Sequence, residues 1–341
     1  MGILCIVPYS QTDSDAIAHY AKTVCDSLSS IGLEINIIDS LQTKNLPYKQ
    51  KKESALLEYI KDHKITTLVI NYSGYGYQKK GMPYWLIKSI AEVRTKHDIT
   101  ILTFFHELYA FGPIYTLSFW THYFQKQIFK YLLKVSHKVI CSNSRMAKLI
   151  ERENIIASQN LYIIPILSNV GEITTEKLIS VRTNQIVIFG TLGLRKKVYD
   201  SNLFYDFIKQ LNVDRVIDIG TGNIQIPDYL PIKVEKYGFL SAKEVSHLLL
   251  VSKWAAISYP QSLLAKSGVF AAYAAHACCV VNFDSDDDGC YHDGLKSELH
   301  YVTPMTLLNQ EITASISLRL YDWYQEHNIQ KHTALFSKLI K

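Results

Sequence analysis

Three cationic side chains follow two glycines in the stretch GTLGLRKK, residues 190–197. An apolar, strand-like run (185–189) precedes it, and a helix-like segment follows from Tyr199. Gly190 and Gly193 let the backbone approach a ligand closely, and Arg195 can bind phosphate oxygens in a bidentate fork. Cations at the start of a helix oppose its macrodipole unless an anion lies there. The stretch therefore predicts a phosphate site; the alternative is a solvated basic loop.

A second candidate lies in ISYPQSLLAKSGVFAAYAAHACCVV, residues 257–281. A strand ends near Pro260, and a helix of small residues begins near Ser267. Lys266, Ser267 and Gly268 offer an ammonium group, a hydroxyl and free backbone N–H groups at that helix start. We expect phosphate or sugar contact here. The alternative is an ordinary N-cap beside a surface lysine.

His106 and Glu107 follow an apolar strand in TFFHELYAFG, residues 103–112. A His–Glu pair can move protons and hydrogen-bond hydroxyl groups, so we regard both as candidate catalytic residues. Adjacent residues on a strand point to opposite faces, so both reach one site only if the chain turns here. If one alone does, His106 is favoured.

The sequence gives little support to two other enzyme classes and to one metal site. VIDIGTGN, residues 216–223, has the acidic residue and glycines of a methyltransferase, but the following NIQIPDYLP leaves no room for a crossover helix. The GxGxxG pattern of a nicotinamide dehydrogenase is absent. The acidic run DSDDDG, residues 284–289, is the nearest match to a metal motif but reads as a surface loop. We expect no metal site.

Alternating strands and helices must position these residues. Short apolar runs alternate with segments of helical period, which predicts parallel sheets covered on both faces, an α/β fold. The predicted strands are 3–7, 34–38, 67–71, 99–105, 138–142 and 161–164, and then 185–189, 215–219, 232–236, 254–258 and 279–282. We expect two Rossmann-like, doubly wound domains facing a central cleft. The predicted domains are 1–167, 184–310, and C-terminal helices 311–341 packing back toward the N-terminal domain.

Composition limits the remaining classes. The net charge of +5 over 341 residues argues against a dedicated nucleic-acid binder. Six scattered cysteines without a CxxC pair indicate buried, reduced thiols. The N-terminus lacks the basic flank of a signal peptide, and no apolar run reaches the ~20 residues of a membrane span. We expect a cytoplasmic protein.

The order and spacing of these motifs carry a family resemblance. FGTLGLRKK, DIGTGN, YGFLSAKEVSHLLLVSKWAAIS and the 263–281 segment resemble the donor half of GT-B glycosyltransferases. NYSGYGYQKKGMPYWL and FFHELYAFGP also resemble the retaining family 4 enzymes that build bacterial polysaccharides. The resemblance implies transfer of a hexosyl group from a UDP- or GDP-type sugar to a saccharide acceptor, with no other cofactor and no metal.

The resemblance also implies residue roles. Lys196 matches a lysine that contacts the donor diphosphate, 237–239 match a turn that meets the nucleobase, and His106 matches a residue beside the donor sugar. The implied donor-binding residues are Gly190, Thr191, Arg195, Lys196, Tyr237, Gly238, Phe239, Ser262, Leu264, Lys266, Ser267 and Gly268. The implied acceptor-binding residues are Tyr72, Ser73, Gly74 and Tyr75.

The chain departs from the family at two positions. Family members often carry two glutamates eight positions apart, and these fall at Leu264 and Ala272 here. Their loss leaves ribose binding and the retaining outcome open. Two alternatives therefore remain: a non-catalytic nucleotide-sugar-binding protein and a sugar-nucleotide epimerase of the same fold.

Four lysines recur every four residues at 126, 130, 134 and 138. One helix face carrying Lys126, Lys130, Lys134 and Lys138 would attract anionic lipid head groups. This predicts peripheral binding to the inner face of the cell membrane and suits a lipid-linked saccharide acceptor. The alternative is a solvated helix face.

Overall fold

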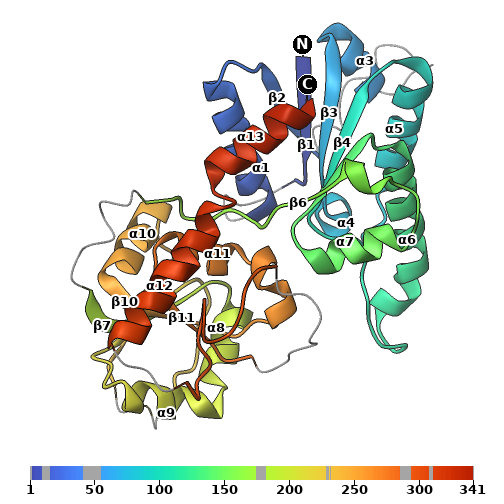
Figure 1. Cartoon of the computed structure of the whole chain (residues 1–341). Helices are drawn as coiled ribbons and strands as arrows, with labels where there is room; N and C mark the ends of the chain where they lie inside the picture. The colour runs from blue at the N-terminus through green and yellow to red at the C-terminus, as the bar shows by residue number, and fades with distance from the viewer. Residues whose placement is uncertain are drawn as a thin grey trace. The chain divides into compact units, whose positions relative to one another are not determined.

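The computed structural model describes residues 2–9, 16–40, 55–173, 182–227, 230, 232–284, 293–306 and 310–340. Its chain contacts divide it into two compact units, 1–164 with 329–341, and 165–328. The α13 helix (Ile329–Ile340) thus belongs to the N-terminal unit, where it packs on α1 (Ala16–Ser30) and β4 (Thr100–Phe105). The α12 helix (Gln310–Gln325) packs on α11 (Gly268–Ala275) in the C-terminal unit (Figure 1).

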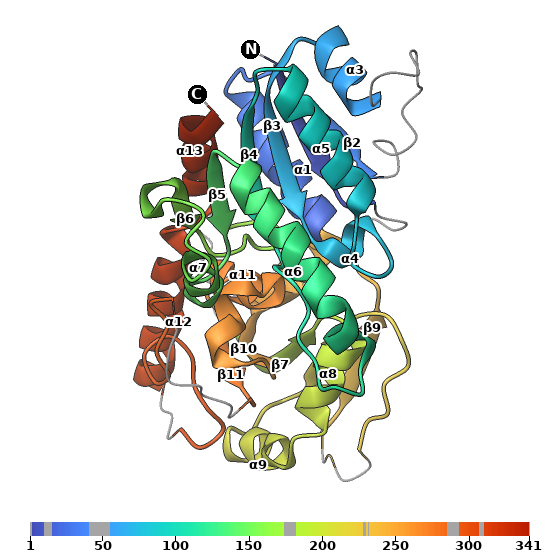
Figure 2. The same cartoon turned by 90° about the vertical axis from the view of Figure 1, so that its right-hand side faces the viewer.

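A six-stranded parallel sheet forms the centre of the N-terminal unit, in the order β2-β1-β3-β4-β5-β6. Neighbouring aromatic residues show how its two faces are covered. Phe104 meets Tyr20 of α1 and Phe336 of α13, whereas Phe105 meets Phe129 of α6. The α3, α5 and α6 helices lie along the second face (Figure 2). The other elements are β1 (Gly2–Val7), β2 (Ile35–Asp39), α3 (Ala55–Asp62), β3 (Ile65–Tyr72), α4 (Gly74–Tyr77), α5 (Tyr84–Lys96), α6 (Leu117–Val135), β5 (Lys138–Cys141), α7 (Ser144–Glu151), the 3-10 turn Ser158–Asn160 and β6 (Leu161–Ile163).

A five-stranded parallel sheet, β11-β10-β7-β8-β9, forms the centre of the C-terminal unit. Val187 belongs to the apolar cluster under α10 and α11, and its neighbours Ile186 and Ile188 belong to the cluster on the face of α8 and α9. The elements are β7 (Thr183–Phe189), α8 (Leu192–Tyr199), α9 (Asn202–Gln210), β8 (Val216–Ile219), β9 (Val234–Gly238), α10 (Ala242–Val251), β10 (Ser252–Ile257), the 3-10 helix Gln261–Lys266 and β11 (Cys279–Asn282).

These sheets confirm the predicted α/β class and two doubly wound domains. The near-continuous burial along β3, β7 and β10 is what strands covered on both faces require. The β8–β9 connection forms no helix in its described residues (220–227, 230, 232 and 233), yet the two strands pair in parallel.

Candidate functional site

The carboxyl edge of the C-terminal sheet collects the predicted donor residues. From β7 the chain adds β8 and β9 on one side, and it then crosses over to add β10 and β11 on the other. The strand order therefore reverses beside β7, and ligands of open α/β sheets bind at such a point, beyond the strand ends. Gly190 and Thr191 follow β7 directly.

Three glycine turns lie at neighbouring strand ends along this edge. Gly190, Gly220 and Gly238 have φ values of 133°, 147° and 64°, which side-chain-bearing residues rarely adopt. Gly220 N donates to Gly238 O (2.8 Å), and Gly190 N donates to Ile219 O (3.1 Å). A Cβ on Gly220 would lie 2.1 Å from Gly190 O, whereas one on Gly193 or Gly238 would meet nothing within 4 Å. The turns thus pack tightly against one another and leave open space beside Gly193 and Gly238.

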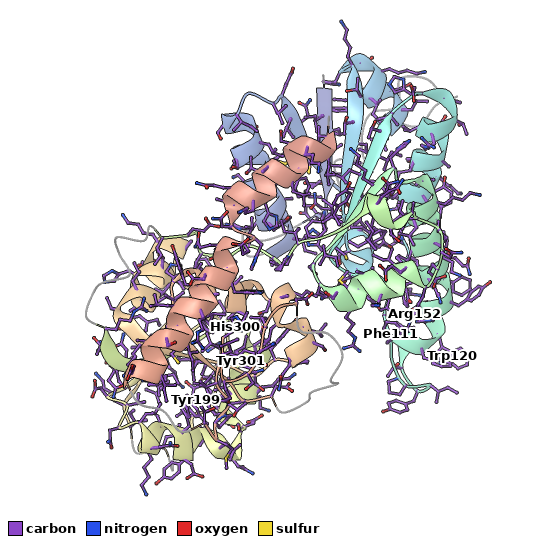
Figure 3. The ribbon with its side chains drawn as sticks, viewed as in Figure 1. Phe111, Trp120, Arg152, Tyr199, His300 and Tyr301 are labelled. Carbon is purple, nitrogen blue, oxygen red and sulfur yellow. The ribbon has the colours of Figure 1, made fainter. Side chains whose placement is uncertain are left out.

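Arg195 holds these turns from beneath. Its guanidinium is buried and ion-paired with Asp218 of β8, and it also donates to Gly190 O (3.1 Å) and to Thr221 O. Tyr199, at the end of α8 (Figure 3), donates to the other Asp218 oxygen (3.2 Å). Burial raises the pKa of Asp218, and the charge of Arg195 opposes that shift. Arg195 was predicted to contact phosphate, but its three internal acceptors favour a role in positioning the loop.

The helix start also differs from the prediction. The α8 helix begins at Leu192, within the GTLGLRKK stretch, directly after Thr191, which takes the extended conformation of an N-cap. Lys196 and Lys197 thus lie in the last turn of α8, where cations are favourable. The macrodipole argument for an anion there is therefore wrong. The helix N-terminus at 191–193 still points its backbone N–H groups outward from an exposed position.

Two side chains flank the third glycine turn. Tyr237 is half-exposed and its hydroxyl donates to Glu235 (3.0 Å), and Phe239 is 70% exposed. Two exposed rings beside a bare backbone turn can hold a planar group by stacking.

The second predicted donor segment is partly buried. Leu264 is 1% exposed, so its side chain belongs to the core and contributes at most its backbone to a site. The Ser267 hydroxyl accepts from Phe270 N (3.2 Å) and caps α11. Ser262 is buried, and Lys266 is partly exposed. The residues open to a ligand in this segment are therefore Lys266 and the backbone at Gly268.

The predicted acceptor residues lie at the reversal point of the N-terminal sheet, between β1 and β3. Tyr72 ends β3 with its ring buried, so its side chain belongs to the core; its hydroxyl has no hydrogen-bond partner within the described part of the chain. Ser73 and Gly74 are also buried, and Tyr75 is 45% exposed. Tyr75 is therefore the predicted acceptor residue whose side chain is open to a ligand.

His106 and Glu107 point to different surroundings, as the strand alternation predicts. His106 is buried against Tyr20 and Phe104, with Nε2 3.0 Å from Asn71 Oδ1. Glu107 is exposed and accepts a hydrogen bond from the Ser73 hydroxyl (2.7 Å). Their backbone N–H groups both approach Tyr72 O, at 2.9 and 3.4 Å. The carboxylate therefore reaches solvent, and the imidazole lies one layer below.

Sequence reasoning missed three supporting residues. Asn71 donates to Cys5 Sγ (3.2 Å), which leaves its oxygen to face His106. Asp218 of β8 pairs with Arg195 of α8, and Tyr199 of α8 donates to the second oxygen of Asp218. The glycine pair after Asp218 indicated a tight turn, but no local pattern indicated the partner of the carboxylate.

The predicted lysine face is only partly formed. Lys126 and Lys130 both pair with Glu153, at 2.9 and 2.7 Å. Partial burial acts to raise the pKa of Glu153, but hydrogen bonds from Lys130 and Lys126 outweigh it, so the pKa of Glu153 is lowered. Lys138 was placed on this helix wrongly, because α6 ends at Val135 and Lys138 begins β5, where Nζ donates to Leu339 O (2.8 Å).

The described residues contain neither a metal-binding group nor a membrane-spanning helix. No group of three or more His, Cys, Asp and Glu in the described residues could hold a metal ion. Of the acidic run 284–289, residues 285–289 lie outside the described residues. No helix in the described ranges is long and apolar enough to cross a membrane.

The chain is similar in structure to several solved enzymes of one fold. An α-glucosyltransferase in complex with UDP and a 13-mer DNA has a TM-score of 0.61 at 9% identity, covering 100% of this chain and 99% of that one. A trehalose-6-phosphate protein from E. coli bound with UDP-2-fluoro glucose has a TM-score of 0.59 at 11% identity, covering 100% and 99%. A putative UDP-N-acetylglucosamine 2-epimerase from Listeria monocytogenes has a TM-score of 0.57 at 8% identity, covering 100% and 95%.

The sequence itself matches no protein-family model and no curated protein. Three of the similar structures contain DNA, so the comparisons lend no support to the exclusion of nucleic acid drawn from net charge. These structures match the chain over its full length, across both sheets described above. The chain therefore has the GT-B fold.

Proposed function

We propose that this protein is a glycosyltransferase that moves a hexosyl group from a UDP- or GDP-type sugar to a saccharide acceptor. The observation that carries the proposal is the set of three positive-φ glycine turns at Gly190, Gly220 and Gly238, beside the N-terminus of α8. Backbone N–H groups at a glycine turn and a helix start suit the oxygens of a diphosphate. Structures of the same fold hold UDP or a UDP-sugar.

The chain's own groups then perform distinct tasks. The glycine turns admit the diphosphate, and Lys196, which is exposed and lies 4.0 Å from Asp200, supplies a cation. Tyr237 and Phe239 flank the nucleobase. Charge grows on the diphosphate as the glycosidic bond breaks, and fixed dipoles and cations stabilise that state more than the ground state. The proposed reaction needs no metal. Glu107, whose carboxylate reaches solvent, is our candidate for accepting the acceptor proton, and the buried His106 lies one layer below it.

A lipid-linked saccharide of bacterial polysaccharide synthesis is the acceptor class that we favour, and we propose retention of the anomeric configuration. An epimerase of the same fold is the second candidate, because one similar structure is a putative epimerase.

The test is a thermal-shift screen with UDP, GDP and their hexoses, followed by product analysis with and without acceptor. Transfer of sugar to an acceptor, or slow release of sugar and nucleoside diphosphate, supports the proposal. Interconversion of free donor without an acceptor supports the epimerase. Binding without any turnover, across donors and acceptors, contradicts both enzymes and leaves the non-catalytic binding protein.

A further inference from the structure

Six large apolar side chains project into solvent from one short segment of the N-terminal unit. Each is at least 63% exposed, and Tyr115 is 85% exposed. Elsewhere among the described residues, only Phe239 and Met305 exceed 60% in this class. Monomeric soluble proteins rarely gather such side chains without a partner. We call these residues the aromatic patch: Phe111, Ile114, Tyr115, Leu117, Trp120 and Tyr123.

The segment that carries the patch is hydrogen-bonded into a defined shape. Thr116 accepts from Phe119 N (3.4 Å) at the start of α6 and donates to Pro113 O (2.7 Å). Ala110 is held at both backbone groups, its N–H by Gln125 Oε1 (2.8 Å) and its oxygen by His122 Nδ1 (2.7 Å). The patch is therefore presented by a folded loop and helix, and Phe111 and Trp120 lie at the same end of α6 (Figure 3).

The first turns of α6 invert the usual pattern of a surface helix. Thr121 and Gln125 are buried, at 6% and 2% exposure, while Trp120 and Tyr123 face solvent. Farther along the same helix the pattern is normal, because Phe129 and Leu132 are buried. A helix that faces water places its polar residues outside and its apolar residues inside. The outer face of this end therefore suits a non-aqueous environment.

The charges around the patch identify that environment. Residues 108–150 contain no Asp or Glu, and neither do residues 72–91. The second segment lies against α6, where Gln125 Nε2 donates to Lys80 O (3.0 Å), and it carries the exposed Lys79 and Lys80. Trp and Tyr rings are typical of the membrane–water interface, and lysines at its edge attract anionic head groups.

We propose that the aromatic patch seats this protein on an anionic lipid bilayer, with Lys79 and Lys80 at the head groups. The patch replaces the lysine face of α6 as the binding surface, because Lys126 and Lys130 are already paired with Glu153. The proposal does not depend on the proposed function, since it concerns attachment and not chemistry.

The experiment is co-sedimentation of the full chain with vesicles of phosphatidylcholine, alone and mixed with phosphatidylglycerol. The Tyr115→Ser/Trp120→Ser variant should lower binding to mixed vesicles about tenfold or more. Lys79→Glu/Lys80→Glu should remove the preference for phosphatidylglycerol, and added salt should do the same. Met305→Ser is the matched control for an exposed apolar residue, and Lys209→Glu/Lys243→Glu is the control for charge.

Trp120→Phe adds a spectroscopic readout. It should keep vesicle binding but lose most of the blue shift in tryptophan emission that vesicles induce. Binding that is unchanged in Tyr115→Ser/Trp120→Ser would overturn the proposal. So would a concentration-dependent dimer that this variant dissociates while vesicle binding persists, because the patch would then be a contact between copies.

Discussion

Arg195 and Asp218 form a buried ion pair beneath the glycine turns at the carboxyl edge of the C-terminal sheet. The pair joins α8 to β8, and through Gly190 O and Thr221 O it fixes two turns at once. Its contribution is therefore to the shape of the candidate donor site.

Asp218→Asn should destabilise the protein by about 3–5 kcal/mol, because it leaves the Arg195 charge buried without its partner. Urea unfolding measures the difference. Lys196→Ala, on the same helix but 66% exposed at its side chain, should change stability by less than about 0.5 kcal/mol. The double variant Arg195→Met/Asp218→Asn should cost less than the sum of its single variants. Additive losses would mean that the pair does not act as a unit.

Two glycine variants distinguish two roles of this edge of the sheet. Gly220→Ala tests how tightly the turns pack, and Gly193→Ala tests whether a ligand approaches the backbone. The first places a methyl group 2.1 Å from Gly190 O at a φ of 147°, so it should unfold or strongly destabilise the C-terminal unit. The second adds a methyl group to α8 where nothing lies within 4 Å. It should leave the fold intact, or stabilise it by up to about 1 kcal/mol.

Nucleotide affinity then decides the role of the turn. If a diphosphate lies beside α8, the added methyl group of Gly193→Ala should weaken UDP or GDP binding in calorimetry without loss of thermal stability. Normal affinity in this variant would exclude close approach of the ligand at Gly193.

The sequence predicted the two-sheet architecture because buried parallel strands are continuous apolar runs, which need no knowledge of distant contacts. It failed where a side chain's role depends on what lies across the sheet. The sequence indicated a phosphate ligand at Arg195, but it did not show that the guanidinium donates to Asp218, 23 residues later. Likewise, a period of four linked Lys138 to the lysines of α6, although the helix ends three residues earlier.

The solvent exposure of individual side chains was the other property that the sequence did not predict. The run from Phe111 to Phe124 is rich in apolar residues, and only the packing shows that Gln125 is buried and Trp120 is exposed. For His106 and Glu107, the sequence left open whether both reach one site and favoured His106 if only one does, whereas the structure buries His106 and exposes Glu107. Which of the two would face solvent depended on the covering helices α1 and α13, whose Tyr20 and His332 bond to each other (2.8 Å) above the imidazole.

Stability of the C-terminal unit should fall in mild acid because of His276. Burial lowers the pKa of His276 to about 4, and its ring nitrogens contact Ser246 Oγ and Ala272 O, both at 2.7 Å. The unfolded value is about 6.5, so the unfolded chain takes up the proton first as the pH falls. The free energy of unfolding should drop by up to about 1.4 kcal/mol per pH unit between these two values.

His276→Gln should flatten that part of the pH profile in urea titrations. His247→Gln, an exposed position on α10, is the control and should retain the wild-type slope. An unchanged slope in His276→Gln would assign the acid sensitivity to other groups.

Lys196→Ala should lower kcat/KM by about 10²–10³ if its ammonium meets the growing diphosphate charge in the transition state. Lys197→Ala removes an equally cationic, exposed neighbour on the next helical position and is the matched control. Steady-state kinetics with the donor found by screening measures both. Equal, small losses of kcat/KM in the two variants would mean that Lys196 acts only through the general surface charge.

Glu107→Gln tests the candidate acceptor base in the N-terminal unit. The substitution keeps the shape of the side chain and its hydrogen bond with Ser73 (2.7 Å), but it removes the charge that could accept a proton. General acid–base help is typically worth about 10²–10⁴ in rate, so kcat should fall by that range. The Kd for nucleoside diphosphate should stay within about twofold, because the glycine turns belong to the other compact unit. Ser73→Ala should give a smaller loss, since it removes only the donor that orients the carboxylate. Glu151→Gln, an exposed carboxylate on α7, is the control.

A pH–rate profile distinguishes a base from a merely structural carboxylate: the acidic limb of kcat should vanish in Glu107→Gln and persist in Ser73→Ala. A variant with near-normal kcat and an unchanged acidic limb would remove Glu107 from the reaction.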